Sequence, residues 1–142
     1  MRYFVVDAFT DKLFGGNPAG VCLVESPLTD DVMQSIAFEN NLSETAFIQG
    51  QDGEYDLRWF TPGTEIDLCG HATLASAFVL SKELPQRERF TFHTKSGELS
   101  VLRHGDDFFL DFPSRPPKAC EKPAILEEAV GVRVLETHIA RD

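Results

Sequence analysis

Cys69, Gly70 and His71 place a thiol, a residue without a side chain and an imidazole side by side, at the start of an uncharged segment. If that segment is a helix, its first amides lack internal hydrogen-bond partners and lie at the positive end of the helix dipole. Gly70 would let an anion approach those amides, and His71 would add a donor or a proton carrier. In the alternative interpretation, Gly70 is a packing gap and His71 is a hydrogen-bonded core residue.

Cys69 is itself a candidate base, because a thiol at a helix N-terminus has a lowered pKa and can abstract protons. The alternative is a small buried hydrophobic residue, which is the commoner role of a free cysteine. The three cysteines of the chain are widely spaced and indicate neither a disulfide framework nor a zinc site. We expect no metal site, because the remaining histidines also lack metal-ligand spacing: His93, His104 and His138.

Glu44 opens a predicted strand, Glu44–Gln49, in which its same-face neighbours are Ala46 and Ile48. If that face points inward, the carboxyl group is partly desolvated, which suits it to act as an acid or a base near neutral pH. The alternative is a solvated glutamate at the end of a strand.

A loop with two glycines, Gly15-Gly16-Asn17-Pro18, could present Asn17 as a clamp on a substrate. It could equally be an ordinary turn. Its glycines do not form a phosphate-binding loop, because the GxGxxG spacing is absent and no Gly-Lys-Ser/Thr sequence follows.

The elements that must position these residues include a helix over Leu68–Ser81, a segment without Asp, Glu, Lys or Arg. A helix that is apolar on all sides must be buried on all sides, so we expect it to pass through the centre of a domain. An amphipathic surface helix is predicted after Thr29, its N-cap. β-Branched and aromatic runs predict the strands: Tyr3–Phe9, Val21–Glu25, Glu44–Gln49, Tyr55–Thr61, Phe90–Thr94, Glu98–Arg103 and Phe108–Phe112. Strands around one buried helix indicate an α+β fold.

The chain has 142 residues, enough for one core of ordinary size. Its net charge is −10, from 13 basic and 23 acidic residues, and no run of residues is basic. We therefore expect neither nucleic acid nor an anionic membrane as a partner, whereas an anionic small molecule stays open. Without a signal peptide or a bilayer-length apolar run, we expect a cytoplasmic protein.

Four prolines between Pro113 and Pro123 predict a linker. We assign residues 1–113 to a folded domain, 114–123 to the proline-rich linker and 124–142 to the start of an incomplete second domain. The last segment has too little apolar content to form a core of its own.

Several stretches, taken together and in order, resemble the PhzF-like family of phenazine biosynthesis: Val6–Thr10, Gly16–Val21, Asn41–Phe47, Arg58–Pro62 and Glu65–Ala75. The resemblance extends from the start of the chain to about Phe112. It implies the fold of diaminopimelate epimerase, in which each of two like domains wraps a strongly curved antiparallel or mixed sheet around a central helix. Residues 1–113 would form the N-terminal domain, and the active site would lie between the two domains.

The resemblance also implies a cofactor-independent isomerase that shifts a proton on a small carboxylated or cyclic substrate, such as a dihydro-hydroxyanthranilate. Glu44 matches the glutamate that removes the proton from one carbon and returns it to another. Ser43, Gly70 and His71 match residues that hold the substrate or help to protonate it, and Asn17 matches a pocket residue.

Two alternatives stay open. The segment that ends in Cys69-Gly70 resembles the epimerase segment that carries a catalytic cysteine, although His71-Ala72 replaces the Asn-Gly that follows there. The protein would then be an amino-acid epimerase or racemase using Cys69. It could also be a non-catalytic remnant or binding module.

The family's sequences are longer, so this chain would hold only half of an active site. We expect a missing C-terminal domain or a second polypeptide to complete it, the chain being a fragment, a truncated product or half of an assembly. Exposed surface meant for that partner favours a homodimer.

Overall fold

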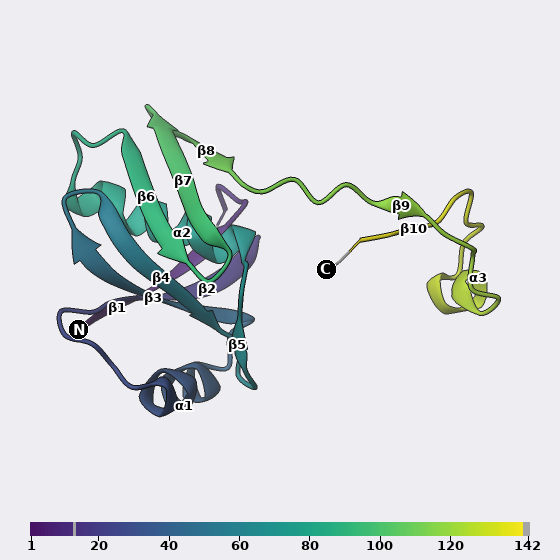
Figure 1. Cartoon of the computed structure of the whole chain (residues 1–142), viewed down its shortest axis with the longest axis horizontal. Coiled ribbons are helices and arrows are strands. Elements are labelled where there is room, and N and C mark those ends of the chain that lie inside the picture. Colours follow the sequence, from purple (N-terminus) through teal and green to yellow (C-terminus); the bar gives the residue numbers. More distant parts are fainter. Residues whose placement is uncertain (13, 141–142) are drawn as a thin grey trace. The chain divides into compact units, whose positions relative to one another are not determined.

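The computed structural model describes residues 1–12 and 14–140, in two compact units, Met1–Asp111 and Phe112–Asp142. In this part of the chain, unit 1 contains an eight-stranded sheet with two helices, and unit 2 a two-stranded sheet with one short helix (Figure 1). None of these helices combines the length and the apolar character that are needed to cross a bilayer.

The sheet of unit 1 is mixed and has the order β1-β2-β3-β4-β6-β7-β8, with β5 also paired to β4. The β2–β3 and β4–β6 pairs are parallel, and the other pairs are antiparallel. Every predicted strand is present. The strands are β1 (Arg2–Ala8), β2 (Asn17–Leu23), β3 (Glu44–Gln51), β4 (Glu54–Phe60), β5 (Glu65–Ile66), β6 (Arg89–Thr94), β7 (Gly97–His104) and β8 (Asp107–Asp111).

The helix α2 (Gly70–Glu83) lies inside the strongly curled sheet, where it contacts β1, β2, β3 and β8 (Figure 1). This arrangement confirms the predicted α+β fold with a central helix. The helix begins at Gly70 rather than Leu68 because Cys69 has an extended backbone (φ −147°, ψ 118°) and forms the N-cap. The helix was predicted to be buried on all sides, but one side is partly open, since Phe78 is 39% exposed.

The helix α1 (Asp30–Asn40) covers β3 and β4 from the other side of the sheet. Its Met33 packs with Phe47 and Phe60, whose rings meet edge to face with centroids 5.5 Å apart. Thr29 is the N-cap, as predicted, and its carbonyl oxygen accepts from the Met33 amide at 3.1 Å, but its hydroxyl makes no capping hydrogen bond. The middle of β3 is therefore buried on both faces.

The strand β2 begins earlier than predicted, so that Asn17 and Pro18 belong to a strand rather than to a loop. At this point β2 pairs only with β1, because its pairing with β3 starts at Ala19, opposite Glu44. Proline has no amide hydrogen and is tolerated at the start of a strand, where one partner is missing. The loop prediction was wrong because proline and asparagine usually mark turns.

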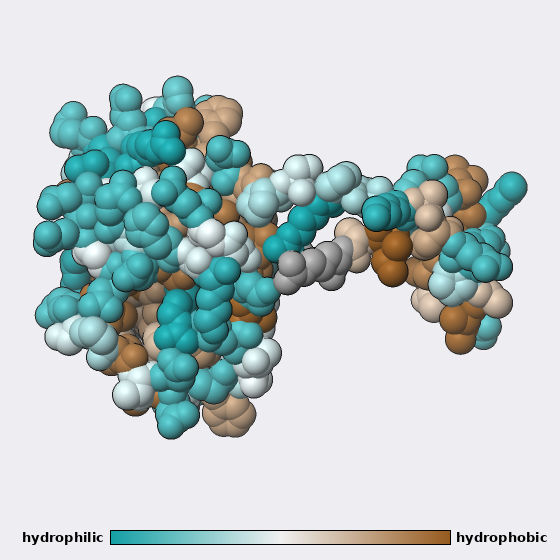
Figure 2. Space-filling model, viewed as in Figure 1, coloured by the Kyte–Doolittle hydropathy of each residue, from teal (hydrophilic) through white to brown (hydrophobic). Residues whose placement is uncertain are grey.

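Unit 2 contains β9 (Lys118–Ala119), α3 (Leu126–Val130) and β10 (His138–Ile139), and its two strands pair antiparallel. β9 lies within residues 114–123, the range predicted as a linker. None of the residues described in this unit is buried. Figure 2 shows hydrophobic surface on this unit. Its exposed large hydrophobic side chains are Ile125, Val130, Val132, Leu135 and Ile139.

Replacing Ala77 by aspartate should severely destabilise unit 1, because Ala77 lies in α2 and is fully buried. An unpaired carboxylate there would lose its hydration without gaining a partner, which lowers the free energy of unfolding by about 3–5 kcal/mol. Urea denaturation followed by circular dichroism measures this change. Lys82→Asp, at an exposed position of the same helix, is the matched control and should cost about 1 kcal/mol or less. Equal losses in the two variants would contradict the burial of α2.

Candidate active site

Glu44 and His71 meet where β3 and α2 begin. Oε2 of Glu44 lies 3.2 Å from Nε2 of His71, and the two side chains are 18% and 9% exposed, respectively. The two atoms are not aligned as a hydrogen bond, and neither has another partner among the described residues. Buried polar atoms normally have partners, and catalytic groups often align only when substrate binds. The pair is therefore a candidate for contact with a substrate.

Glu44 reaches this position because its face of β3 points inward. Ala46 and Ile48, on the same face, are 0% and 2% exposed. Ala46 lies opposite Trp59 of β4, which is also buried. The condition for partial desolvation of the Glu44 carboxyl group is thus met, and the solvated alternative does not fit.

Cys69 lies beside His71 at the head of α2. Its sulfur is 3.4 Å from Nδ1 of His71, and its carbonyl oxygen accepts a hydrogen bond from the Thr73 hydroxyl at 2.6 Å. Donor atoms of Glu44, Cys69 and His71 all lie within 4.8 Å of one another, a set that could ligate a metal ion. Ligand spacing along the sequence did not indicate this set, because Glu44 comes from a separate strand.

The expected lowering of the Cys69 pKa is not found. Burial raises the pKa of Cys69 to about 11, and the nearby negative charge of Glu44 adds to this, while the amides of Ala72 and His71 oppose it only in part. Desolvation outweighs the helix dipole because the thiol is buried. At neutral pH the sulfur therefore keeps its proton. An anion bound at the N-terminus of α2 would share the backbone amides of His71 and Ala72 with this sulfur.

Ser43 and Asn17 lie next to each other at the starts of the parallel strands β3 and β2. The Ser43 hydroxyl donates to Oδ1 of Asn17 at 3.5 Å. Ser43 is exposed and Asn17 is half-buried, so their polar groups are accessible to solvent beside the start of β3. The structure thus brings the residues from the strands together with those from the helix, through the contact of Glu44 with His71.

The course of the backbone just before Asn17 depends on Gly16. This residue has a φ of +66°, which side chains disfavour, and a Cβ atom there would lie only 2.1 Å from the carbonyl oxygen of Ala8. Only glycine allows the backbone at position 16 to lie this close to the end of β1. Gly16 therefore helps to determine the position of Asn17, the next residue.

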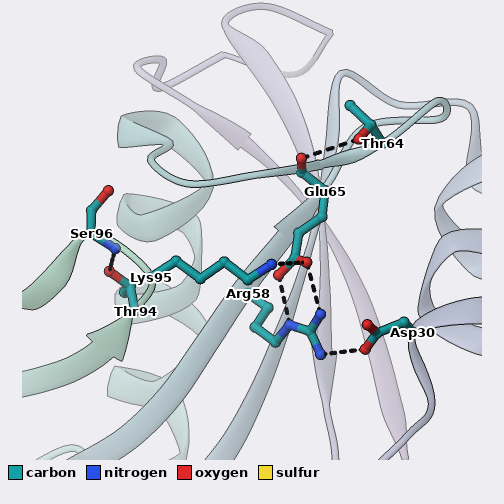
Figure 3. Close-up of polar contacts among 7 residues, drawn as sticks. All are labelled: Asp30, Arg58, Thr64, Glu65, Thr94, Lys95 and Ser96. Atoms are coloured by element: carbon teal, nitrogen blue, oxygen red, sulfur yellow. Dashed lines mark hydrogen bonds and ion pairs between the residues drawn. The ribbon is translucent and has the colours of Figure 1, made fainter.

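A cluster of ion pairs beside α1 fixes the segment that leads into the site (Figure 3). Arg58 donates from Nε and Nη2 to the two carboxylate oxygens of Glu65, at 2.7 and 2.8 Å. Its Nη1 donates to Asp30 of α1 at 2.8 Å, and Lys95 also pairs with Glu65. Glu65 lies in β5, shortly before Cys69, so the bidentate pair anchors the approach to the helix head.

The sequence patterns did not single out Arg58 or Glu65. The two-residue strand β5 is too short to give a periodic signal, and the register that places Glu65 against β4 cannot be read from the sequence. One available signal was the arginine itself, because a charged residue within the otherwise apolar end of β4 usually requires a partner.

The chain matches the PhzC-PhzF family of phenazine biosynthesis-like proteins over residues 6–122. It belongs to this family. A solved PhzF-family structure from Enterococcus faecalis superimposes with a TM-score of 0.90 at 47% identity, over 99% of this chain and 54% of the other. The predicted resemblance is therefore confirmed.

Relatives in the PhzC-PhzF family are longer than this chain. An uncharacterized isomerase from Pseudomonas aeruginosa is 54% identical over 137 residues, which cover 96% of this chain and 53% of the relative. A human phenazine biosynthesis-like domain-containing protein is 46% identical over 90% of this chain and 49% of its own length. The chain thus spans about half the length of the curated relatives it matches. The structure of a predicted epimerase from P. aeruginosa, with a TM-score of 0.65 at 26% identity, covers 81% of this chain and 45% of its own.

Glu65→Gln should make unit 1 less stable in a pH-dependent way. Hydrogen bonds from Arg58 hold the pKa of Glu65 below its usual value; burial opposes this and Lys95 assists it. Such a carboxylate stabilises the fold above its unfolded pKa, and this contribution is lost as the pH falls through its folded pKa. At pH 7 the variant should lose about 1.5–3 kcal/mol of unfolding free energy. Its difference from the wild type should shrink below about pH 4.

Urea denaturation between neutral and acidic pH measures that difference. Glu54→Gln is the control, because Glu54 is 62% exposed and pairs only with His93 among the described residues, so its loss should cost about 0.5 kcal/mol or less. A Glu65→Gln deficit that stayed constant across the pH range would show that Glu65 acts through packing rather than charge.

Proposed function

We propose that this chain carries the N-terminal half of the active site of a cofactor-independent isomerase that shifts a proton on a small carboxylated or cyclic substrate. The observation that supports this most is the carboxylate of Glu44, 3.2 Å from the buried imidazole of His71, with neither atom in an aligned hydrogen bond among the described residues. Membership in the PhzC-PhzF family, and a close relative named as an isomerase, support the reaction class.

Glu44 acts first as the base and then as the acid. Its carboxylate takes a proton from one carbon of the substrate, and the electron pair of the broken C–H bond moves into the adjoining conjugated system. The carboxyl group then returns the proton to a different carbon, so a double bond changes place and Glu44 recovers its starting state. The electrons stay within the substrate, so no redox partner takes part.

The N-terminus of α2 stabilises the negative charge that develops on the substrate. Gly70, without a side chain, lets a carboxylate approach the first turn, and His71 supplies a donor from its ring. In a chain with a net charge of −10, the helix terminus is a local source of positive potential. Ser43 and Asn17 bind polar groups of the substrate at the solvent side.

The other wall of the pocket comes from a C-terminal domain or a second polypeptide, since the chain spans about half of its curated relatives. The exposed side of α2 at Phe78 supports a partner on this unit. A homodimer and a cytoplasmic location remain predictions.

A Cys69-based epimerase is the second candidate, favoured by the sulfur's place beside His71 and by the similarity to a predicted epimerase structure. The raised pKa of Cys69, about 11, weighs against it, because only the thiolate abstracts protons well. We therefore assign the base to Glu44.

Glu44→Gln should abolish proton transfer while largely sparing binding, since the amide has nearly the same shape and cannot take a proton. Loss of a general base lowers the rate by about 10²–10⁴-fold. The measurement is deuterium uptake from D₂O into a dihydro-hydroxyanthranilate, by NMR, with the protein at its native length. Calorimetry checks that the variant still binds this compound.

Cys69→Ala is the matched comparison and should reduce deuterium uptake far less than Glu44→Gln does, because the protonated thiol is not the base. If Cys69→Ala abolished deuterium uptake and Glu44→Gln largely spared it, the epimerase-like mechanism would be favoured. If neither substitution changed the rate, the site would be a binding pocket and the proposed isomerase would be wrong.

A further inference from the structure

His71 stands between two partners of different chemistry. Its Nδ1 is 3.4 Å from the Cys69 sulfur, and its Nε2 is 3.2 Å from Oε2 of Glu44. The ring is 9% exposed, so these contacts, rather than bulk water, determine where its hydrogen lies. A neutral imidazole carries one hydrogen, so one ring nitrogen donates and the other accepts.

Only one neutral tautomer suits both contacts. An ionised carboxylate can only accept, so a bare Nε2 would place two sets of lone pairs 3.2 Å apart, whereas a hydrogen on Nε2 brings the positive end of the N–H bond close to the carboxylate even though the two atoms are not aligned as a hydrogen bond. Nδ1 must then accept, and the partner within reach is the Cys69 thiol. The thiol is buried, lies 3.4 Å from Nδ1 and carries the one hydrogen that this contact needs.

We propose that Cys69 is a positioning residue, whose S–H donates to Nδ1 of His71 and thereby holds the ring in the tautomer that carries its hydrogen on Nε2, the nitrogen nearer Glu44. The Thr73 hydroxyl donates a hydrogen bond to the Cys69 carbonyl oxygen at 2.6 Å and so stabilises the turn that positions the thiol. The role deepens the proposed function and rests on it for its catalytic consequence: an Nε2–H can stabilise negative charge on the substrate, whereas a bare nitrogen cannot.

The test is the histidine tautomer, read from two-bond proton–nitrogen correlations in the chain labelled with ¹⁵N-histidine. The chain has four histidines, and the His71 signals are those lost in His71→Gln. In the wild type we expect a single neutral tautomer with Nε2–H. Cys69→Ser, which keeps a donor, should preserve it, and Cys69→Ala should give a mixture of both tautomers. Cys69→Val replaces the alanine variant if that variant does not fold.

Cys22→Ala is the matched control, because Cys22 is also buried with its pKa raised to about 11 but packs in the cluster beneath α1. It should leave the His71 tautomer unchanged. An Nδ1–H form in the wild type would overturn the proposal, as would a single Nε2–H form that persists without the thiol, since Glu44 alone would then set the tautomer. The measurement uses no substrate, so failure here is distinct from failure of the proposed isomerase activity.

Discussion

The structure depends on the burial of α2, a helix that has almost no polar face. Such a helix is stable in water only when other elements enclose it, and here the sheet curls around it. Because α2 packs against β2 and β3, its first turn lies next to the first residue of β3. The contact between Glu44 and His71 is therefore a result of core packing and does not depend on the conformation of a long loop.

The sheet separates two kinds of charged group. Arg58 lies on the α1 side of β4, where its guanidinium group is paired with carboxylates from α1 and β5. Glu44 lies on the α2 side of β3, where its Oε2 atom has no aligned hydrogen bond within the described part of the chain. The paired charges hold β4, β5 and α1 together, and the incompletely paired carboxylate is the group to which we assign proton transfer. Departures from complete hydrogen bonding are expected at functional sites.

The amino-acid sequence allowed much of this arrangement to be predicted, and the reasons for the failures are physical. The uncharged run Leu68–Ser81 predicted the central helix, and β-branched and aromatic runs predicted the strands. The extension of β2 through Pro18 and the raised pKa of Cys69 were not foreseen, because both depend on which neighbours surround a residue. The contact of Glu44 with His71 needed the register of β3 and the path of α2, which no local pattern contains. The roles of the site residues came from the family resemblance, and they remain predictions.

The burial of β3 on both faces has a consequence for the dynamics of the site. Its middle residues are covered by α1 on one side and by α2 on the other, so their amides can meet water only when a large part of the core opens. Glu44 directly precedes these buried residues. Its backbone therefore has little local freedom, because opening this strand would require the surrounding core to open as well.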